Sequence, residues 1–339
     1  MPEERRGPMR IAGRPIRDVA SIVIVLVLVA ALAAVPGFAS AYDRRFLTEI
    51  FMLITLAIAW NLVGGLAGYV SFGNVAFFGL GAYTASILMV RGIAPFPVAV
   101  LAAAVVSILA AFIIGRLVLR LRGHYFAIVT LGIAEAIRQL VSVATDLTGG
   151  GIGLNLPLLS GTVETRANIF YYSMLGLVVL AFVTSAVILR SQLGYGLRAI
   201  RASEDAAATL GVDTTRSKVI AFVIAAGLGG IAGGIYAPWT LYIDPPTVFS
   251  IDLSVQPIVL TLVGGVGTLW GPVVGGVVVL VVGEAIWGSF LELHTAFLGT
   301  VLIITVILLP RGLVSLPGIF RGGARSPSAI VAAIRRYGV

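Results

Sequence analysis

Residues 197–220 read LRAIRASEDAAATLGVDTTRSKVI, a charged and alanine-rich segment between two apolar stretches at 168–189 and 218–239. Each stretch is close to the roughly 20 apolar residues that a helix needs to cross a bilayer. Charged side chains are costly within the hydrocarbon, so this segment must connect two spans outside it. The arrangement predicts a helical chain that crosses the membrane more than once.

The composition extends this prediction to the whole chain. Of its 339 residues, 59% are hydrophobic and 11% are charged, and the mean hydropathy is +1.06. Soluble domains have roughly 25% charged residues, so this chain lacks the polar side chains that would cover a soluble core. We predict an all-α, polytopic membrane protein with about ten spans, within a range of about eight to ten.

Several classes of function do not fit this composition. Cysteine is absent, and the two histidines, His124 and His294, are far apart, so no metal site is expected. The net charge of +8 comes from arginines that flank the apolar runs, which is the positive-inside pattern and not a nucleic-acid surface. No Walker A loop, nucleophile elbow, zinc-protease motif or dinucleotide fingerprint is present. We therefore expect no catalytic residues and no enzyme activity.

The apolar runs and the arginines together predict a topology. The spans are expected at 19–35, 46–63, 71–90, 95–116, 124–145, 168–189, 218–239, 254–269, 272–289 and 295–310. Ala39-Ser40-Ala41 resembles a signal-peptide cleavage site, but the preceding run is long for a signal sequence, which favours a retained first span. Ten spans place every arginine-rich segment in the cytoplasm. The expected parts are a cytoplasmic N-terminus (1–18), a transmembrane domain (19–310) and a cytoplasmic basic tail (311–339), with residues 190–218, here called the connector, also cytoplasmic.

Two glycine-rich segments interrupt the apolar runs. GGLAGYVSFGNVAFFGLGAYTASIL (64–88) predicts a broken or re-entrant helix near 64–90, because glycine allows either close helix packing or a break that lines a watery path. The buried amide of Asn74 favours the path, so Ser71 and Asn74 are candidate translocation residues. VGGVGTLWGPVVGG (263–276) is a second interruption, of a kind that transporters place at their pathway.

Charges and glycines elsewhere suggest further candidates. In HYFAIVTLGIAEAIRQL (124–140), Glu135 and Arg138 share one helix face, and charges at that depth usually face a bundle interior or a cavity. A structural ion pair and a gating role both remain open for them. Gly149 and Gly150 belong to the glycine-rich loop 148–157, which we expect to form a mobile entrance. Glu284 is another acid within an apolar run.

Local signals in the connector predict a helix of about two turns. Ser203 is a good N-cap, Glu204 and Asp205 then lie in the first turn, and Gly211 can end the helix in a left-handed conformation. A helix this short is marginal in water alone, so it needs a partner to pack against. The face expected to meet that partner consists of Ala206, Ala207 and Leu210.

The pattern Asp205-Ala206-Ala207, three residues and then Gly211 resembles the "EAA" coupling loop of bacterial ABC importer permeases, with either Glu204 or Asp205 as its acid. Five segments occur in a characteristic order: GYVSFGNVAFFGLGAYTAS, LRGHYFAIVTLGIAEAIRQL, TGGGIGL, GLRAIRASEDAAATLGVD and GGVGTLWGPVVGG. Together they are similar to the branched-chain amino acid permease family, in its LivM branch, over roughly residues 45–315.

The resemblance implies a permease subunit of an ATP-driven importer in the bacterial inner membrane. Its partners would be a homologous LivH-like permease, LivG-like and LivF-like ATPases that use ATP and Mg, and an extracytoplasmic substrate-binding protein. Membrane lipid would surround this chain, which would bind no cofactor and no nucleic acid itself. The implied ATPase-coupling residues are Arg198, Arg201, Glu204, Asp205, Ala206, Ala207 and Gly211.

Two alternatives to a branched-chain amino acid importer remain. The same architecture could import urea, short amides, aromatic acids or another small carboxylate. A proton-coupled secondary transporter would instead relay protons through Glu135 and Glu284, and it would have no use for a docking helix. A scaffold without transport activity would not account for the glycine-broken spans.

Overall fold

The computed structural model describes residues 15–287 and 312–315. The predicted span at 295–310, His294, and most of the predicted terminal segments 1–18 and 311–339 lie outside the described residues. The helices are α1 (Pro15–Ala34), α2 (Ala41–Trp60), α3 (Asn74–Val90), α4 (Phe96–Val118), α5 (His124–Val143), α6 (Thr145–Thr148), α7 (Val163–Arg190), α8 (Gln192–Ala202), α9 (Glu204–Thr209), α10 (Thr214–Thr240), α11 (Pro245–Val248), α12 (Ile251–Gly264) and α13 (Gly271–Trp287). Two short strands, β1 (Leu154–Asn155) and β2 (Tyr242–Ile243), pair antiparallel.

The described helices confirm an all-α membrane protein but not ten spans. Six segments are long and apolar enough to cross a membrane: Ala41–Gly65, Phe96–Val118, His124–Val143, Val163–Arg190, Thr214–Thr240 and Pro245–Gly264. Three further apolar helices are shorter, at Val25–Gly37, Asn74–Val90 and Gly271–Glu284. The expected count of about ten spans is thus not confirmed, and the expected span at 295–310 lies outside the described residues.

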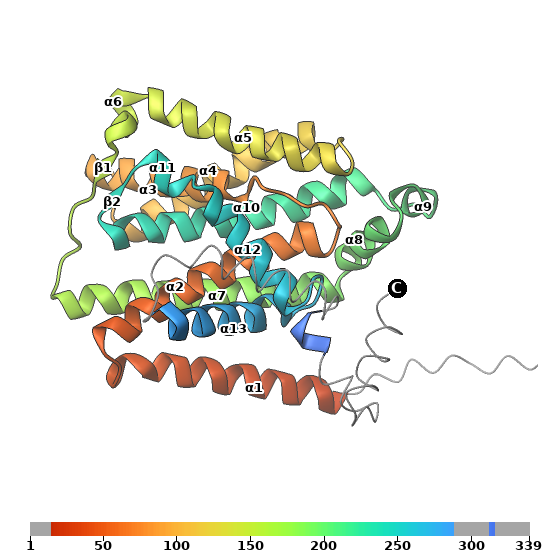
Figure 1. Cartoon of the computed structure of the whole chain (residues 1–339), viewed down its shortest axis with the longest axis horizontal. Helices are drawn as coiled ribbons and strands as arrows, with labels where there is room; N and C mark the ends of the chain where they lie inside the picture. Colours follow the sequence, from red (N-terminus) through yellow and green to blue (C-terminus); the bar gives the residue numbers. More distant parts are fainter. Residues whose placement is uncertain (1–14, 288–311, 316–339) are drawn as a thin grey trace, which may run out of the picture.

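The helices lie side by side with α2 at the centre of the bundle (Figure 1). In the most apolar stretch of α2, 83% of the residues are buried, against 17% in α5 at the edge. Helix α2 packs against α7, α10, α12 and α13, while α10 packs against α3 and α4. Helices α8 and α9 protrude at one end of the bundle, and β1 and β2 lie at the other.

Close contacts between α3 and α10 explain several of the glycines. A β-carbon on Gly81 would overlap the backbone of Gly230, and one on Gly233 would overlap the carbonyl group of Phe78. Small residues let two helix backbones approach closely, which maximises dispersion contacts where no water is present to drive association. For this part of the glycine-rich segment, the structure therefore supports tight packing.

We expect Gly233→Ala to lower the free energy of unfolding by about 1–3 kcal/mol, because the added methyl group forces the closely packed helices α3 and α10 apart. Thermal unfolding of the purified protein would measure the effect. Gly132→Ala is the matched control, since Gly132 also lies within a helix but an added β-carbon there meets no atom within 4 Å. Equal melting temperatures for the two variants would contradict the packing argument.

The structure places both predicted interruptions. Helix α2 ends in a π-helical turn, Asn61–Gly65, and the chain is irregular from 66 to 73 before α3 begins. Helix α12 has 14 residues and ends at Gly264, and residues 265–270 form a turn before α13. Gly267 has a φ of +75° in this turn, a conformation that favours glycine.

Candidate functional site

The connector forms the short helix that its sequence predicts. Ser203 caps α9 by accepting a hydrogen bond from the Ala206 amide at 3.3 Å. Gly211 follows the helix with a φ of +85°, and Asp213 caps α10 through the amide of Arg216 at 2.9 Å. These caps satisfy backbone groups that would otherwise lack partners at the helix ends. The connector is therefore an ordered element that protrudes from the bundle.

The orientation of α9 differs from the expected one. Ala207 is 1% exposed and belongs to the hydrophobic core of this chain, so the prediction that it faces a partner is wrong. Leu210 is 82% exposed, and Ala206 is also exposed. A helix of this length presents only part of its surface, and the bundle already covers the side on which Ala207 lies. The surface available to a partner is thus built around Leu210 and Ala206.

The two acids at the start of α9 have different environments. The Glu204 side chain is 13% exposed and accepts a hydrogen bond from Lys218 Nζ at 2.6 Å. The Asp205 side chain is 81% exposed and pairs with Arg122 Nη1 at 2.9 Å. The sequence left open which acid belongs to the coupling pattern. In the structure Glu204 anchors the connector to the bundle, and Asp205 is the acid exposed at its surface.

Lys218 is the centre of a buried polar network. Its side chain is 3% exposed, and Nζ also donates to the carbonyl oxygen of Leu119 at 2.9 Å and to the Tyr69 hydroxyl at 3.1 Å. Tyr69 in turn donates to Glu204. The network joins α9 and α10 to the irregular segment 66–73 and to the end of α4. Sequence reasoning missed Lys218, although it is the only lysine in the chain and begins a long apolar stretch.

The network keeps Glu204 ionised. Burial of the carboxylate raises its pKa, but the hydrogen bonds from Lys218 and Tyr69 and the positive charge of Lys218 outweigh burial, so the pKa lies below its usual value. A folded-state pKa below the unfolded one contributes stability above the ordinary Glu pKa of about 4.3. This contribution is lost as the pH falls through the lowered value.

The two arginines predicted to couple, Arg198 and Arg201, bind the backbone of their own chain. Arg201 Nη1 donates to the carbonyl oxygen of Gly65 at 2.6 Å, at the end of the π-helical turn. A β-carbon added to Gly267 would lie 2.6 Å from the same nitrogen, so Arg201 also packs against the turn between α12 and α13. Arg198 donates to the carbonyl oxygen of Leu189 at 3.0 Å. Arg201 thus connects the connector to both interruptions of the bundle.

Asn61 ties the two interruptions to each other. It is 1% exposed, and its side chain accepts from the Gly267 amide at 2.8 Å and donates to the Thr268 carbonyl oxygen at 2.9 Å. These residues are more than 200 positions apart, at separations of 206 and 207. Sequence reasoning missed Asn61; the only local signal was a lone amide at the end of an apolar run.

We expect Asn61→Leu to destabilise the protein, because it leaves the Gly267 amide and the Thr268 carbonyl without this partner. Each buried unsatisfied group costs about 1–3 kcal/mol. The melting temperature of the purified protein would report this loss. Asn155→Leu serves as the control, since Asn155 is exposed, and a melting temperature for Asn61→Leu no lower than that of the control would contradict the assignment.

The candidate translocation residues near the first interruption are both buried. Ser71 is 0% exposed, and its hydroxyl accepts a hydrogen bond from the Gly73 amide at 3.1 Å, which is a local structural role. Asn74 is 8% exposed, and its Nδ2 has no hydrogen-bond partner among the described residues. Of the two, Asn74 retains donors that a passing solute or water could use.

The remaining candidates lie apart from these. Arg138 and Glu135 form a bidentate ion pair whose side chains are 27% and 53% exposed, so the pair lies on the outer face of α5, and the expectation of a bundle-interior position is wrong for this chain. Gly149 and Gly150 have φ values of +73° and +60° and form a tight turn after α6. The structure does not bring Asn74, the ion pair and the glycine turn into one site.

The described residues thus form an apolar helical bundle of the membrane-spanning class, in which an ordered polar connector contacts two interrupted segments. The sequence matches the family described as "Branched-chain amino acid transport system / permease component" over residues 44–306. The chain belongs to this family.

Individual relatives agree with the family match. The chain is 31% identical to the high-affinity branched-chain amino acid transport system permease protein LivM of Salmonella typhimurium, over 85% of this chain and 74% of the relative. It is 31% identical to LivM of Escherichia coli, over 80% and 69% of the two chains. It is also 24% identical to the permease protein LivH of Escherichia coli, over 80% and 96%. No solved structure matches the chain with significance.

Proposed function

We propose that this chain is one of two permease subunits of an ATP-driven ABC importer for branched-chain or related amino acids. The connector would lie on the cytoplasmic side, where an ATPase groove receives α9. Partner ATPases would hold ATP and Mg, and an extracytoplasmic binding protein would deliver the substrate. Similarity to both LivM and LivH supports a pair of homologous permeases.

The observation that carries this proposal is the linkage from the connector to both interruptions. Glu204 binds Lys218, which contacts Tyr69 in the first interruption, and Arg201 contacts both Gly65 and Gly267. A displacement of the connector would therefore move both segments together. Coupling between the ATPases and the pathway needs an element of this kind. Its position must respond both to the nucleotide state of the ATPases and to the state of the pathway.

The charged pair on the outer face of α5 is evidence for a second membrane subunit that covers it. Charges that face lipid are costly, and intramembrane charges usually face protein or water. The Glu135–Arg138 pair lies on the most exposed of the six long helices, where a homologous permease would cover it. In this proposal the pair serves the subunit interface or the pathway along it.

Uptake assays separate this proposal from the alternatives. We expect cells that express the complete importer to accumulate labelled leucine while ATP is maintained, even after a protonophore collapses the proton gradient. Uptake that stops when the proton gradient collapses, but continues when ATP is depleted, would support the proton-coupled alternative. Uptake of urea, short amides or aromatic acids in place of leucine would keep the architecture and change the substrate.

A further inference from the structure

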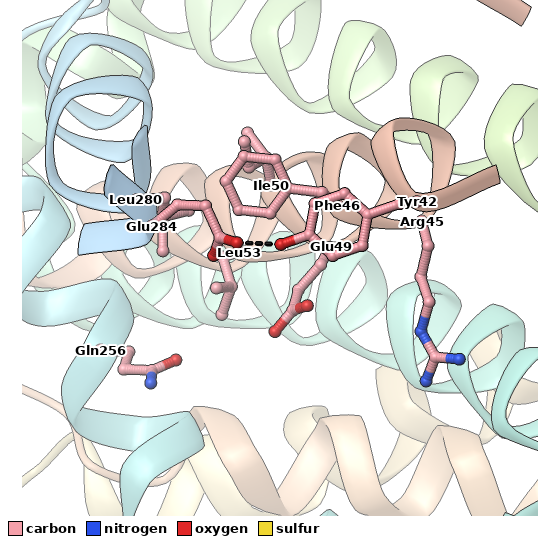
Figure 2. A pocket seen from close by; sticks show the side chains of 9 residues that line it. All are labelled: Tyr42, Arg45, Phe46, Glu49, Ile50, Leu53, Gln256, Leu280 and Glu284. Atoms are coloured by element: carbon pink, nitrogen blue, oxygen red, sulfur yellow. Dashed lines mark hydrogen bonds between the residues drawn. The ribbon is translucent and has the colours of Figure 1, made fainter. Parts of the chain in front are cut away.

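A small cavity of mixed polarity lies between α2, α12 and α13. Its volume is about 150 Å³. Sites for drug-sized ligands usually have volumes of roughly 300–1,000 Å³, so this cavity suits a much smaller solute. Figure 2 shows its lining, which consists of Tyr42, Arg45, Phe46, Glu49, Ile50, Leu53, Gln256, Leu280 and Glu284.

Helix periodicity brings opposite charges to one space. Arg45 and Glu49 are four residues apart on α2 and therefore lie on one face of that helix. Glu284 comes from α13 and Gln256 from α12. In Figure 2 the ends of Arg45, Glu49 and Gln256 extend to the same side of α2, below the contact between Tyr42 and Glu284.

Contacts within the wall hold Arg45 and Glu284 and leave each of them further hydrogen-bonding capacity. The Arg45 guanidinium lies 5.6 Å from the ring centroid of Trp239, and a contact with a ring face leaves N–H donors for an anion. The Tyr42 hydroxyl donates to one Glu284 oxygen, and a carboxylate has further acceptor sites. Phe46, Ile50, Leu53 and Leu280 supply an apolar surface beside these groups.

We propose that this cavity is a binding site for a zwitterionic amino acid with an aliphatic side chain. The α-carboxylate would pair with Arg45, the α-ammonium with Glu49 and Glu284, and the side chain would lie against Leu53 and Leu280. A solute with both charges on one carbon and an adjacent hydrocarbon group matches all three features of the wall. The inference rests on the proposed import of amino acids and places a substrate contact within this chain.

The absence of cysteine from the chain allows a direct test. In a Gln256→Cys variant, purified as the full chain with its co-expressed partners in phosphatidylglycerol nanodiscs, a polar thiol reagent would label the cavity. We expect leucine to slow labelling at least threefold and saturably. Isoamylamine and 4-methylpentanoate, which each lack one of the two charges, should leave the rate unchanged. An Asp252→Cys variant, whose thiol lies on α12 outside the cavity lining, should show no protection.

A second substitution tests whether protection by leucine depends on the charge of Arg45 or only on the shape of the cavity. Adding Arg45→Gln to the Gln256→Cys variant should abolish protection by leucine, whereas adding Arg91→Gln should preserve it, because Arg91 does not line the cavity. Equal protection by leucine and its singly charged analogues, or unchanged protection with Arg45→Gln, would overturn the proposal. The proposal would also be overturned if labelling were slower in phosphatidylethanolamine nanodiscs than in phosphatidylglycerol nanodiscs and leucine slowed it no further. A lipid headgroup would then be the occupant.

The uptake assay keeps this test distinct from the proposed function. If the importer accumulates leucine but leucine never protects the Gln256→Cys variant, the cavity is not the site and the function stands. If leucine is not accumulated under any condition, the proposed function fails independently of the labelling result.

Discussion

Replacing Lys218 with methionine is expected to destabilise the protein by about 3–5 kcal/mol, because it removes the buried cation from the Glu204 carboxylate and leaves only the exposed Arg122, at 3.4 Å. The Glu204 side chain is 13% exposed, so water cannot fully replace the lost ammonium. The connector should lose its hydrogen bond to the end of α4, while the direct bond from Tyr69 to Glu204 remains. We expect a lower melting temperature. If the position of the connector that couples to the pathway loses as little as about 1.4 kcal/mol of this stabilisation, substrate uptake should fall at least about tenfold.

The double variant Lys218→Met/Glu204→Gln is the control for this prediction. Removing both charges should restore much of the stability, because neutral replacements avoid the penalty of an unpaired ion. In the single variant the pKa of Glu204 should rise, so the stability difference from the native protein should narrow as the pH falls toward about 4. A single variant as stable as the native protein at neutral pH would show that the network does not hold the connector.

Replacing Leu210 with aspartate is expected to remove ATPase association while leaving the fold intact. Leu210 is 82% exposed in this chain, so its loss should cost little folding stability. In the proposed groove the side chain would be buried, and burial of a leucine contributes about 1.5–3 kcal/mol. We expect at least a tenfold weaker association of the ATPases, measured by co-purification and by uptake.

Leu158→Asp is the matched control, because Leu158 is also exposed, at 61%, but lies outside the connector. Its association with the ATPases should be unchanged. If Leu210→Asp also leaves association and uptake unchanged, α9 is not the docking element. A lower melting temperature for Leu210→Asp alone would instead assign Leu210 a role in folding.

Much of the fold followed from local signals in the sequence. Apolar runs predicted the helices, because length and hydropathy are properties of short segments. Ser203 and Gly211 correctly predicted the two ends of α9, since each acts on backbone groups within three or four residues of itself. The glycine-rich segments predicted the interruptions, whose positions in the structure are 61–73 and 265–270.

The site depended on contacts that no local signal reveals. Ala207 faces inward and Glu135 outward, because helix packing decides which side of each helix is covered. Glu204 and Asp205 are adjacent, yet only Glu204 reaches Lys218.

The sequence by itself determined the membrane class, the helices and the capped connector, since these depend on hydropathy and on neighbours along the chain. Only the tertiary structure decided that Asn61 binds Gly267 and Thr268, and that Arg201 reaches the same turn from α8. Hydrogen bonds between residues about 200 positions apart form only after the helices have packed, so burial and pairing are properties of the folded bundle.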